Sequence, residues 1–215
     1  MGALIYLVKT KLPEYIGTSP FEIQVLTPMR KGELGVEHLN EVLQYYLNPA
    51  SESKKEKEGR TGVFREGDKV MQVKNNYKLE WKITNEKGFS VEEGLGVFNG
   101  DMGVIKQINT YSERITVVFD ENREVEYPYS NLDELELAYA ITIHKSQGSE
   151  YPAVVLPLLS GPPILCNRNL LYTAITRAQK CAAIVGRQSM VEQMIHNETE
   201  QKRYSGLNEC LKDGI

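Results

Sequence analysis

Cysteine is scarce in this 215-residue chain, and its placement excludes two kinds of stabilising site. The chain has three cysteines, an odd number, and none lies at the short spacing that zinc ligands use. They are Cys166, Cys181 and Cys210. We therefore expect neither a disulfide framework nor a metal site. Reduced cysteines are typical of a cytoplasmic protein, and cytoplasmic is the location that we predict.

The chain also lacks long apolar segments. Nowhere does an apolar stretch approach the roughly 18 to 20 residues that span a bilayer. The short run at residues 3–8 has no basic segment before it and no small-residue cleavage pattern after it, so it differs from a signal peptide. We expect no membrane partner.

A third absence concerns phosphate binding. Many ATP-hydrolysing enzymes hold the phosphates in a glycine-rich loop that ends in Lys and Ser or Thr (Walker A), and hold magnesium with a carboxylate at a strand end (Walker B). The pattern Gly-x-x-x-x-Gly-Lys-Ser/Thr does not occur in the 215 residues. We therefore expect that the chain alone does not hydrolyse ATP.

Positive charge is not in excess either. The chain has 25 Lys and Arg against 29 Asp and Glu, which gives a net charge of −4 at pH 7. Non-specific binding to nucleic acid depends on the neutralisation of phosphates by Lys and Arg. The composition therefore excludes a protein that coats DNA by bulk attraction, but it permits a few phosphate contacts in a groove.

The most informative segment is a polar turn between two apolar runs, at residues 138–143 and 153–158. Ligands of open α/β sheets bind where strands end. We interpret the turn as part of a nucleotide or nucleic-acid site, with a solvated loop between two core strands as the alternative. Its residues combine donors, acceptors and charge: Thr142, His144, Lys145, Ser146, Gln147, Gly148, Ser149 and Glu150.

Residues 169–180 form a second informative segment. Helical spacing of its apolar residues predicts a helix face that packs on a sheet, and Arg177 falls outside that face. The face consists of Leu171, Ala174, Ile175 and Ala178.

Four segments, in this order along the chain, resemble those of RecD-like superfamily 1 DNA helicases, the group that includes exodeoxyribonuclease V alpha subunits and TraA-type proteins. Residues 23–40 are similar to motif IV. The pair 67–77 and 96–103 is typical of the same group. Residues 138–156 are similar to motif V, and residues 170–180 to motif VI. Together the four segments cover most of the chain.

This resemblance implies the C-terminal motor domain of an ATP-dependent DNA helicase, as a piece of a longer protein. ATP and Mg²⁺ would be bound mainly by an N-terminal RecA-like domain of the same parent chain. Single-stranded DNA would be the track, and subunits of a nuclease complex are possible further partners. Two alternatives stay open: a non-motor DNA-binding or scaffolding module with a helicase-like fold, and the helicase part of a conjugative relaxase.

The resemblance also implies roles for single residues. Arg177 matches the arginine finger of motif VI, which stabilises charge on the γ-phosphate in the transition state. Arg30 matches a second phosphate contact, with Lys31 as an alternative. The implied nucleotide contacts are Gln147, Gly148 and Glu150, and the implied DNA contacts are Thr142, His144, Lys145 and Asn76. The alternatives are plain surface roles for Arg177 and Glu150 and a core position for a neutral His144.

Strands alternate with helices after residue 132, and several strands are apolar throughout. This predicts an α/β fold whose parallel sheet has helices on both faces, which the resemblance identifies as RecA-like. We expect residues 1–61 and 134–215 to form this domain. Short strands and turns at residues 62–133 predict an inserted small barrel, SH3-like by the resemblance. Its interior residues would be Val104, Ile108, Val117 and Phe119.

Two polar segments have no clear role in the sequence. Residues 48–60, after an amphipathic helix predicted at 34–47, mix Lys and Glu without large apolar residues, so we expect a mobile surface loop. Residues 77–95 are longer than the family pattern and hold the only tryptophan, Trp81. Its alternation with neighbouring apolar residues favours packing in a hairpin, with stacking on an unpaired base as the alternative.

Overall fold

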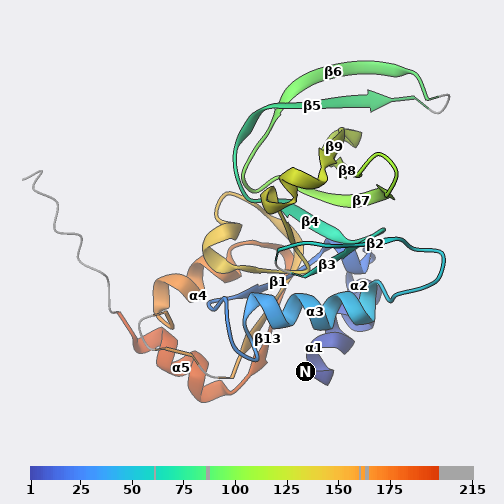
Figure 1. The fold of residues 1–215 in the computed structure, drawn as a ribbon. Helices are drawn as coiled ribbons and strands as arrows, with labels where there is room; N and C mark the ends of the chain where they lie inside the picture. Colours follow the sequence, from blue (N-terminus) through green and yellow to red (C-terminus); the bar gives the residue numbers. More distant parts are fainter. Residues whose placement is uncertain (61, 86–87, 160, 163–164, 199–215) are drawn as a thin grey trace, which may run out of the picture.

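Two large sheets lie one above the other in Figure 1, and the described residues also contain a small third sheet of two strands. The lower sheet is parallel and has helices around it, and the upper sheet is antiparallel. Cys210 and the polar C-terminal tail lie outside the described residues. The structure is a computed structural model that describes residues 1–60, 62–85, 88–159, 161–162 and 165–198.

The lower sheet has four strands, and every pairing in it is parallel. Its order is β11 (Ala140–Thr142), β1 (Ile23–Thr27), β12 (Tyr151–Leu158) and β13 (Ala178–Gly186). All five residues of β1 are buried, because this strand lies inside the sheet with apolar side chains on both faces. The sheet confirms the predicted α/β fold.

Helices cover both faces of the parallel sheet. Neighbouring residues of a strand point to opposite faces, so Val25 and Leu26 belong to two different apolar clusters. Val25 packs with α3 (Val36–Leu47) and the N-terminal helical segments, and Leu26 packs with α4 (Arg168–Ile175) and α5 (Gln188–His196). The N-terminal segments are α1 (Gly2–Tyr6), the π-helical turn η1 (Leu7–Lys11), α2 (Leu12–Ile16) and the 3₁₀ turn η2 (Pro20–Glu22).

The upper sheet has seven antiparallel strands and contains the predicted barrel segment. Its order is β10 (Leu135–Leu137), β4 (Lys69–Gln72), β7 (Met102–Asn109), β8 (Arg114–Phe119), β9 (Glu124–Pro128), β5 (Asn76–Thr84) and β6 (Ser90–Val97). The 3₁₀ turns η3 (Asp120–Asn122) and η4 (Tyr129–Glu134) connect strands of this sheet. Because β10 follows residue 133, the sheet extends beyond the expected insertion, and the domain limits stay a prediction.

The expected barrel interior is wrong at one position. Val104 is 39% exposed, whereas its neighbour Ile105 is 1% exposed. The register of β7 against β8 shifts between Ile105 and Gln107, so an extra residue on β7 reverses the alternation of side chains there. Ile108, Val117 and Phe119 are buried as predicted.

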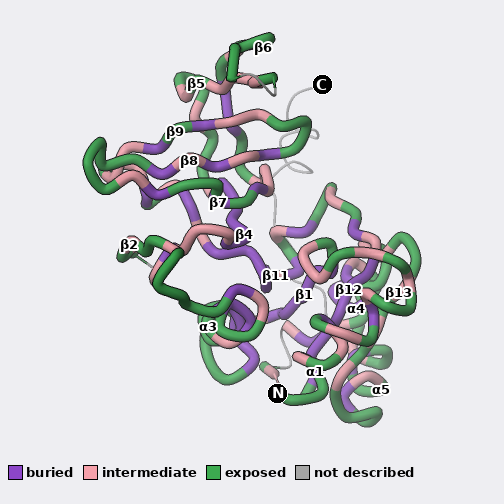
Figure 2. Tube along the Cα trace, turned by 90° about the vertical axis from the view of Figure 1, so that its right-hand side faces the viewer, coloured by how far each residue is buried: buried purple, intermediate pink, exposed green. Residues whose placement is uncertain are grey.

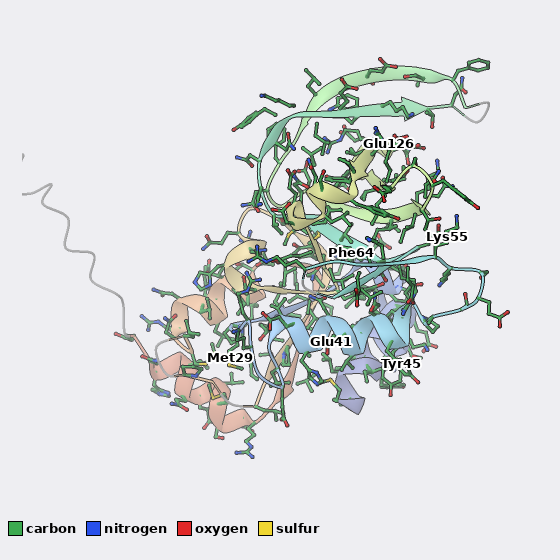
Figure 3. The ribbon with its side chains drawn as sticks, in the orientation of Figure 1. Met29, Glu41, Tyr45, Lys55, Phe64 and Glu126 are labelled. Atoms are coloured by element: carbon green, nitrogen blue, oxygen red, sulfur yellow. The ribbon has the colours of Figure 1, made fainter. Side chains whose placement is uncertain are left out.

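Two further expectations differ from the structure. Ile175 is 40% exposed, because it is the last residue of α4 and lies beyond the part of the helix that packs on the sheet. The predicted loop at residues 48–60 contains β2 (Glu56–Glu58), which pairs with β3 (Val63–Arg65). The polar side chains of β2 did not prevent it from pairing with β3. Phe64 of β3 anchors the pair to the apolar core, because it is buried between α3 and the upper sheet (Figure 3).

The two sheets share one apolar cluster, which continues from the strands of the lower sheet into those of the upper sheet. In Figure 2 the buried segment of β4 in the upper sheet continues in space into the buried segments of β1 and β11 in the lower sheet. Polar bonds cross the same junction: Lys69 of β4 donates from Nζ to the Gln24 Oε1 atom at 2.9 Å and to the Phe21 carbonyl at 2.7 Å. The relative position of the two sheets is therefore fixed by apolar and polar contacts together.

Candidate functional site

The turn between β11 and β12 is closed by its own short side chains. Thr142 caps the 3₁₀ turn η5 (Ile143–Ser146), and its Oγ1 accepts a hydrogen bond from the Lys145 backbone N at 3.4 Å. The buried Ser146 donates from Oγ to the Ile143 carbonyl at 2.7 Å. Gly148 has a φ of 89°, a conformation that side chains with a Cβ rarely adopt. These contacts give the predicted motif V turn a defined shape.

The predicted ligand contacts on this turn differ in accessibility. His144, Gln147 and Glu150 are exposed, while Thr142 and Lys145 are half-buried. The core position considered for His144 is therefore wrong. A Cβ placed on Gly148 would meet no atom within 4 Å, so backbone conformation rather than crowding within the chain requires a glycine there.

Arg30 and Lys145 meet at a carboxylate that the sequence analysis did not single out. Glu136 of β10 accepts a hydrogen bond from Arg30 Nη2 at 3.0 Å and another from Lys145 Nζ at 2.9 Å. Burial alone would raise the pKa of the Glu136 carboxyl, but the hydrogen bonds from the two cations outweigh it and the pKa lies below its ordinary value. Lys31, the alternative to Arg30, is exposed.

The loop that carries Arg30 is tightly bonded to the start of α3. Thr27 donates from Oγ1 to the Leu34 carbonyl at 2.6 Å, and the Arg30 carbonyl accepts from the Glu37 backbone N at 3.2 Å. A Cβ on Gly35 would lie 2.6 Å from the Arg30 carbonyl oxygen, so this position admits only glycine without a shift of the backbone. Met29, labelled in Figure 3, marks the loop.

Arg177 lies between the end of α4 and the start of β13. Its Nε donates to the Thr173 carbonyl at 3.2 Å, and its Nη1 donates to the Ser149 carbonyl at 3.2 Å. The Tyr151 backbone N donates to the Arg177 carbonyl at 2.8 Å. Segments similar to motifs V and VI are therefore in direct contact, with Glu150 beside them and 3.4 Å from Gln179 Nε2.

The structure separates the predicted site residues into two groups at opposite ends of the parallel sheet. Thr142 is opposite Thr27 at the carboxyl end of β1, and Ala153 is opposite Ile23 at its amino end. Four residues of strand correspond to about 13 Å. Arg30 and Lys145 follow the carboxyl ends of β1 and β11, whereas Glu150 and Arg177 precede the amino ends of β12 and β13.

Asn76 belongs to neither group. It lies at the start of β5 in the upper sheet, where its Nδ2 donates to Glu134 Oε2 at 3.0 Å. Gln72 donates to the same carboxylate oxygen from Nε2 at 3.0 Å. Asn76 is thus part of the polar framework of the barrel, and the structure does not bring it together with the other predicted DNA contacts.

Two positioning residues escaped the sequence analysis. Asn40 of α3 donates from Nδ2 to the Leu137 and Ala140 carbonyls at 3.0 and 2.9 Å, and Gln24 of β1 donates to the Ala138 carbonyl at 3.1 Å. These bonds fix the link between β10 and β11, and with it Glu136. The signal available in the sequence was the presence of polar residues at buried helix and strand positions, such as Gln24 within the apolar strand β1.

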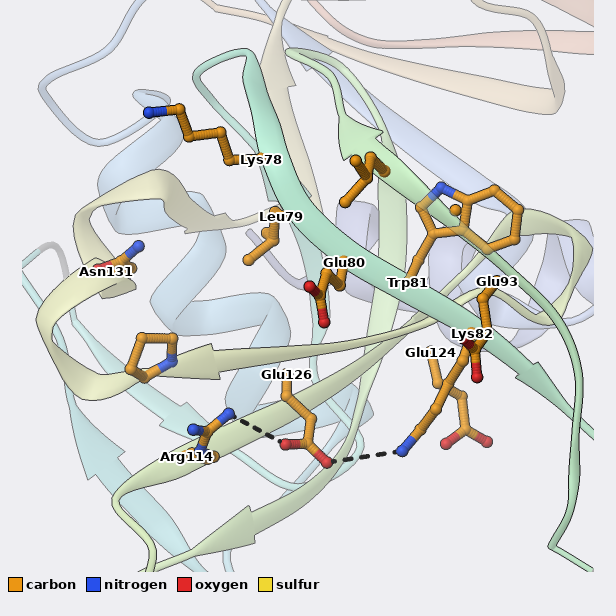
Figure 4. A pocket seen from close by; sticks show the side chains of 13 residues that line it. Lys78, Leu79, Glu80, Trp81, Lys82, Glu93, Arg114, Glu124, Glu126 and Asn131 are labelled. Carbon is orange, nitrogen blue, oxygen red and sulfur yellow. Dashed lines mark hydrogen bonds and ion pairs between the residues drawn. The ribbon is translucent and has the colours of Figure 1, made fainter.

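Trp81 packs within the upper sheet. Its indole ring lies over Gly94 on the paired strand, where an added Cβ would overlap the ring, and it contacts the shared apolar cluster. A groove of about 610 Å³ runs beside it under the β5–β6 hairpin. Three of the charged side chains in this groove form ion pairs: Glu126 contacts Arg114 at 3.2 Å and Lys82 at 3.9 Å (Figure 4). The packing alternative for Trp81 is the one that these contacts support.

Two family models and a curated relative match the chain. The ATP-dependent RecD-like DNA helicase SH3 domain matches residues 39–119, and the UvrD-like helicase C-terminal domain matches residues 137–185. An ATP-dependent RecD2 DNA helicase of Deinococcus radiodurans is 40% identical over 160 residues, which are 74% of this chain and 19% of the relative. The chain belongs to the RecD-like helicases. The predicted family and the SH3 insertion are thereby confirmed.

A second relative shows how much of a RecD-like protein this chain represents. The RecBCD enzyme subunit RecD of Mycolicibacterium smegmatis is 30% identical over 191 residues, which are 89% of this chain and 29% of the relative. The chain therefore spans less than a third of either relative.

The fold also has a counterpart among solved structures. A Pif1 helicase from Bacteroides, in complex with ADP-AlF3 and ssDNA, has a TM-score of 0.51 and 18% identity, and the match covers 88% of this chain and 46% of that one. At this identity the likeness shows the fold alone. It agrees with the arrangement of the parallel sheet and the inserted sheet described above.

The structure bears on two of the expectations drawn from absences in the sequence. In the described part of the chain, no helix is long and apolar enough to cross a membrane. Cys166 and Cys181 are free, and Cys166 is buried.

Proposed function

We propose that the chain is the C-terminal part of an ATP-dependent DNA helicase that supplies an arginine finger, a ribose contact and part of the track for single-stranded DNA. The observation that supports this most is the contact between motifs V and VI. Arg177 donates from its side chain to the Ser149 carbonyl at 3.2 Å, and its carbonyl accepts from the Tyr151 backbone N at 2.8 Å. Distant segments thus form one site beside the carboxylate of Glu150.

The residues of this site fit the donors and acceptors that a nucleotide needs. The guanidinium of Arg177 offers N–H donors in a planar fork that matches phosphate oxygens, and the Glu150 carboxylate can accept hydrogen bonds from ribose hydroxyls. ATP, when bound, supplies the phosphoryl group whose transfer drives the motor. Among the described residues no group of three or more His, Cys, Asp or Glu is placed to hold a metal ion. The family resemblance, together with the missing Gly-x-x-x-x-Gly-Lys-Ser/Thr pattern, leads us to assign Mg²⁺ and the phosphate loop to an N-terminal RecA-like domain.

The other end of the sheet suits the backbone of single-stranded DNA. His144 lies there in the turn η5, and Lys145 and Arg30 supply positive charge close by. Backbone contacts from a few such residues position a strand without reading its sequence. The similarity to a RecBCD subunit supports subunits of a nuclease complex as further partners.

Substitution of Arg177 in the complete gene product that contains this chain tests the proposal. Arg177→Ala should lower the DNA-stimulated kcat for ATP hydrolysis by at least about a hundredfold, with a smaller change in nucleotide affinity, because the guanidinium acts mainly on charge that develops in the transition state. Arg168→Ala, which removes an exposed arginine at the start of α4, the helix that precedes Arg177, is the matched control.

Two results would contradict the proposal. A wild-type kcat for Arg177→Ala would mean that this arginine only bonds to carbonyls within its own domain. Turnover by the 215-residue chain alone, measured by phosphate release with saturating single-stranded DNA and retained after repurification, would mean that it needs no separate phosphate loop.

A further inference from the structure

Glu136 bonds to two cations that the family resemblance assigns to different ligands. Its Oε1 accepts from Arg30 Nη2 at 3.0 Å, and its Oε2 accepts from Lys145 Nζ at 2.9 Å. Arg30 matches a nucleotide-phosphate contact, and Lys145 matches a DNA contact. Because one carboxylate joins them, both cations lie within reach of a single anion.

The carboxylate is the fixed member of this cluster. Its neighbours Leu135 and Leu137 are buried, and the Leu137 carbonyl accepts a hydrogen bond from Asn40 Nδ2 at 3.0 Å. The Glu136 side chain is 19% exposed, against 27% for Lys145 and 50% for Arg30. A ligand that approaches from solvent therefore meets the cations before it meets the carboxylate.

Arg30 keeps hydrogen-bond donors for a second anion. Glu37 and Glu41 line the same small cavity as Arg30 and Glu136, so an anion is held there by N–H donors and not by an excess of positive charge. Arg30 has five N–H donors, of which Nη2 donates to Glu136. Phosphate oxygens accept the same charge-assisted hydrogen bonds as a carboxylate, so phosphate and Glu136 compete for the same donors.

We propose that Glu136 is a positioning residue that holds Arg30 and Lys145 together as one phosphate-binding pair and weakens that pair by competing with phosphate for its donors. This inference rests on the proposed function, which offers two sources of phosphate: the DNA backbone and the nucleotide. Glu136 belongs to β10, which pairs with β4 of the upper sheet. Phosphate binding at the pair therefore loosens one of the bonds that join the upper sheet to the carboxyl ends of β1 and β11.

The test compares the 215-residue chain with its Glu136→Gln variant. Fluorescence anisotropy with a labelled oligothymidylate at several salt concentrations measures the DNA arm, and calorimetry with inorganic pyrophosphate measures the free-phosphate arm. Glu136→Gln should tighten binding by about threefold to tenfold, the range of a partly exposed ion pair. It should also steepen the salt dependence by about 0.7 for each additional phosphate that the protein neutralises. Glu14→Gln, an exposed position on α2, controls for the change in net charge.

A second substitution distinguishes competition from a structural effect. In a Lys145→Gln background the gain from Glu136→Gln should shrink, because one of the two donors that the carboxylate restrains is gone. A gain that is unchanged in this background would overturn the inference. Unfolding of each variant, followed by circular dichroism, verifies that the compared proteins are folded.

The outcomes separate the inference from the proposed function. Tighter binding of oligothymidylate alone supports the inference with DNA as the source, and tighter binding of pyrophosphate alone supports it with the nucleotide as the source. If the wild-type chain binds DNA and Glu136→Gln binds no more tightly, the inference fails while the proposed function stands. If neither protein binds either probe, the inference fails, and so does the proposed DNA track of this chain, whereas the role of Arg177 is judged by its own assay.

Discussion

Removal of the Asp68 side chain should destabilise the junction between the two sheets strongly. Asp68 is fully buried, and its carboxylate accepts hydrogen bonds from Gln44 Nε2 at 2.6 Å, Asn48 Nδ2 at 2.7 Å and Tyr139 Oη at 2.9 Å. The Arg65 backbone N also donates to it at 2.6 Å. These donors come from α3 and the residue after it, from β3 and from the residue before β11, so one carboxylate joins three parts of the chain.

The expected loss in Asp68→Ala follows from the donors that lose their acceptor. A buried donor without a partner costs roughly 1 to 3 kcal/mol. Burial raises the pKa of Asp68 above its ordinary value, although the hydrogen bonds act in the opposite direction, so the ionised carboxylate is itself unfavourable there. Removal of that charge offsets part of the loss. We expect a decrease in the free energy of unfolding of about 3 to 5 kcal/mol, at the upper end of single substitutions.

Urea denaturation followed by circular dichroism measures this loss, since the midpoint shifts while the slope stays the same in a two-state transition. Asp120→Ala is the control, because Asp120 is an exposed aspartate in the same sheet region and should change the midpoint little. A loss below about 1 kcal/mol for Asp68→Ala would refute the reasoning, since the buried donors would then have found other partners.

Two further predictions concern the junction and the hairpin. Burial lowers the pKa of Lys69 in the folded protein to about 8, so above that pH the unfolded chain binds more protons than the folded one. The contribution of Lys69 to the free energy of unfolding should therefore rise on the order of 1 kcal/mol between about pH 8 and 9.5. Urea midpoints of the wild type and of Lys69→Met should diverge across this range, and parallel curves would contradict the shift. Trp81→Ala should lower stability by about 1 to 3 kcal/mol, because a half-buried ring is lost from its contact with Gly94. Its affinity for oligothymidylate should not change, and a clear loss of affinity in the folded variant would favour base stacking instead.

Local patterns predicted the elements of the fold well. The helix at residues 34–47, the strand at 114–119 and the strands around the motif V turn follow from the period of apolar residues, and the structure has them within a few residues. The errors arise where a local feature overrides the period. Between Ile105 and Gln107 an extra residue on β7 changes which side chains face the core, and nothing in the sequence marks a bulge at that position.

The candidate site was predictable as a set of residues but not as an arrangement. The polar turn at residues 142–150 predicted that these side chains gather near strand ends, and they do. Which end of the sheet each residue occupies depends on the strand register, which places Thr142 beside Thr27 and Ala153 beside Ile23. The spacing of residues along the sequence contains no information on which residues of two strands lie opposite each other. Arg30 and Arg177, which the family resemblance pairs, therefore lie at opposite ends.

The contact that joins Arg30 to Lys145 shows why long-range chemistry is the hardest part to predict. Glu136 lies in a short strand whose alternation of Leu, Glu and Leu indicates only that its side chain leaves the core. Its position beside two cations depends on the return of the chain from the upper sheet, which Asn40 and Gln24 fix through the carbonyls of residues 137–140. Asn40 and Gln24 are polar residues in an apolar helix and an apolar strand. Their hydrogen bonds place the Glu136 carboxylate of the upper sheet at the ends of β1 and β11. A buried polar residue in an apolar strand or helix therefore indicates that its side chain bonds to the backbone of another segment. That segment in turn positions a side chain of its own, as residues 137–140 position Glu136.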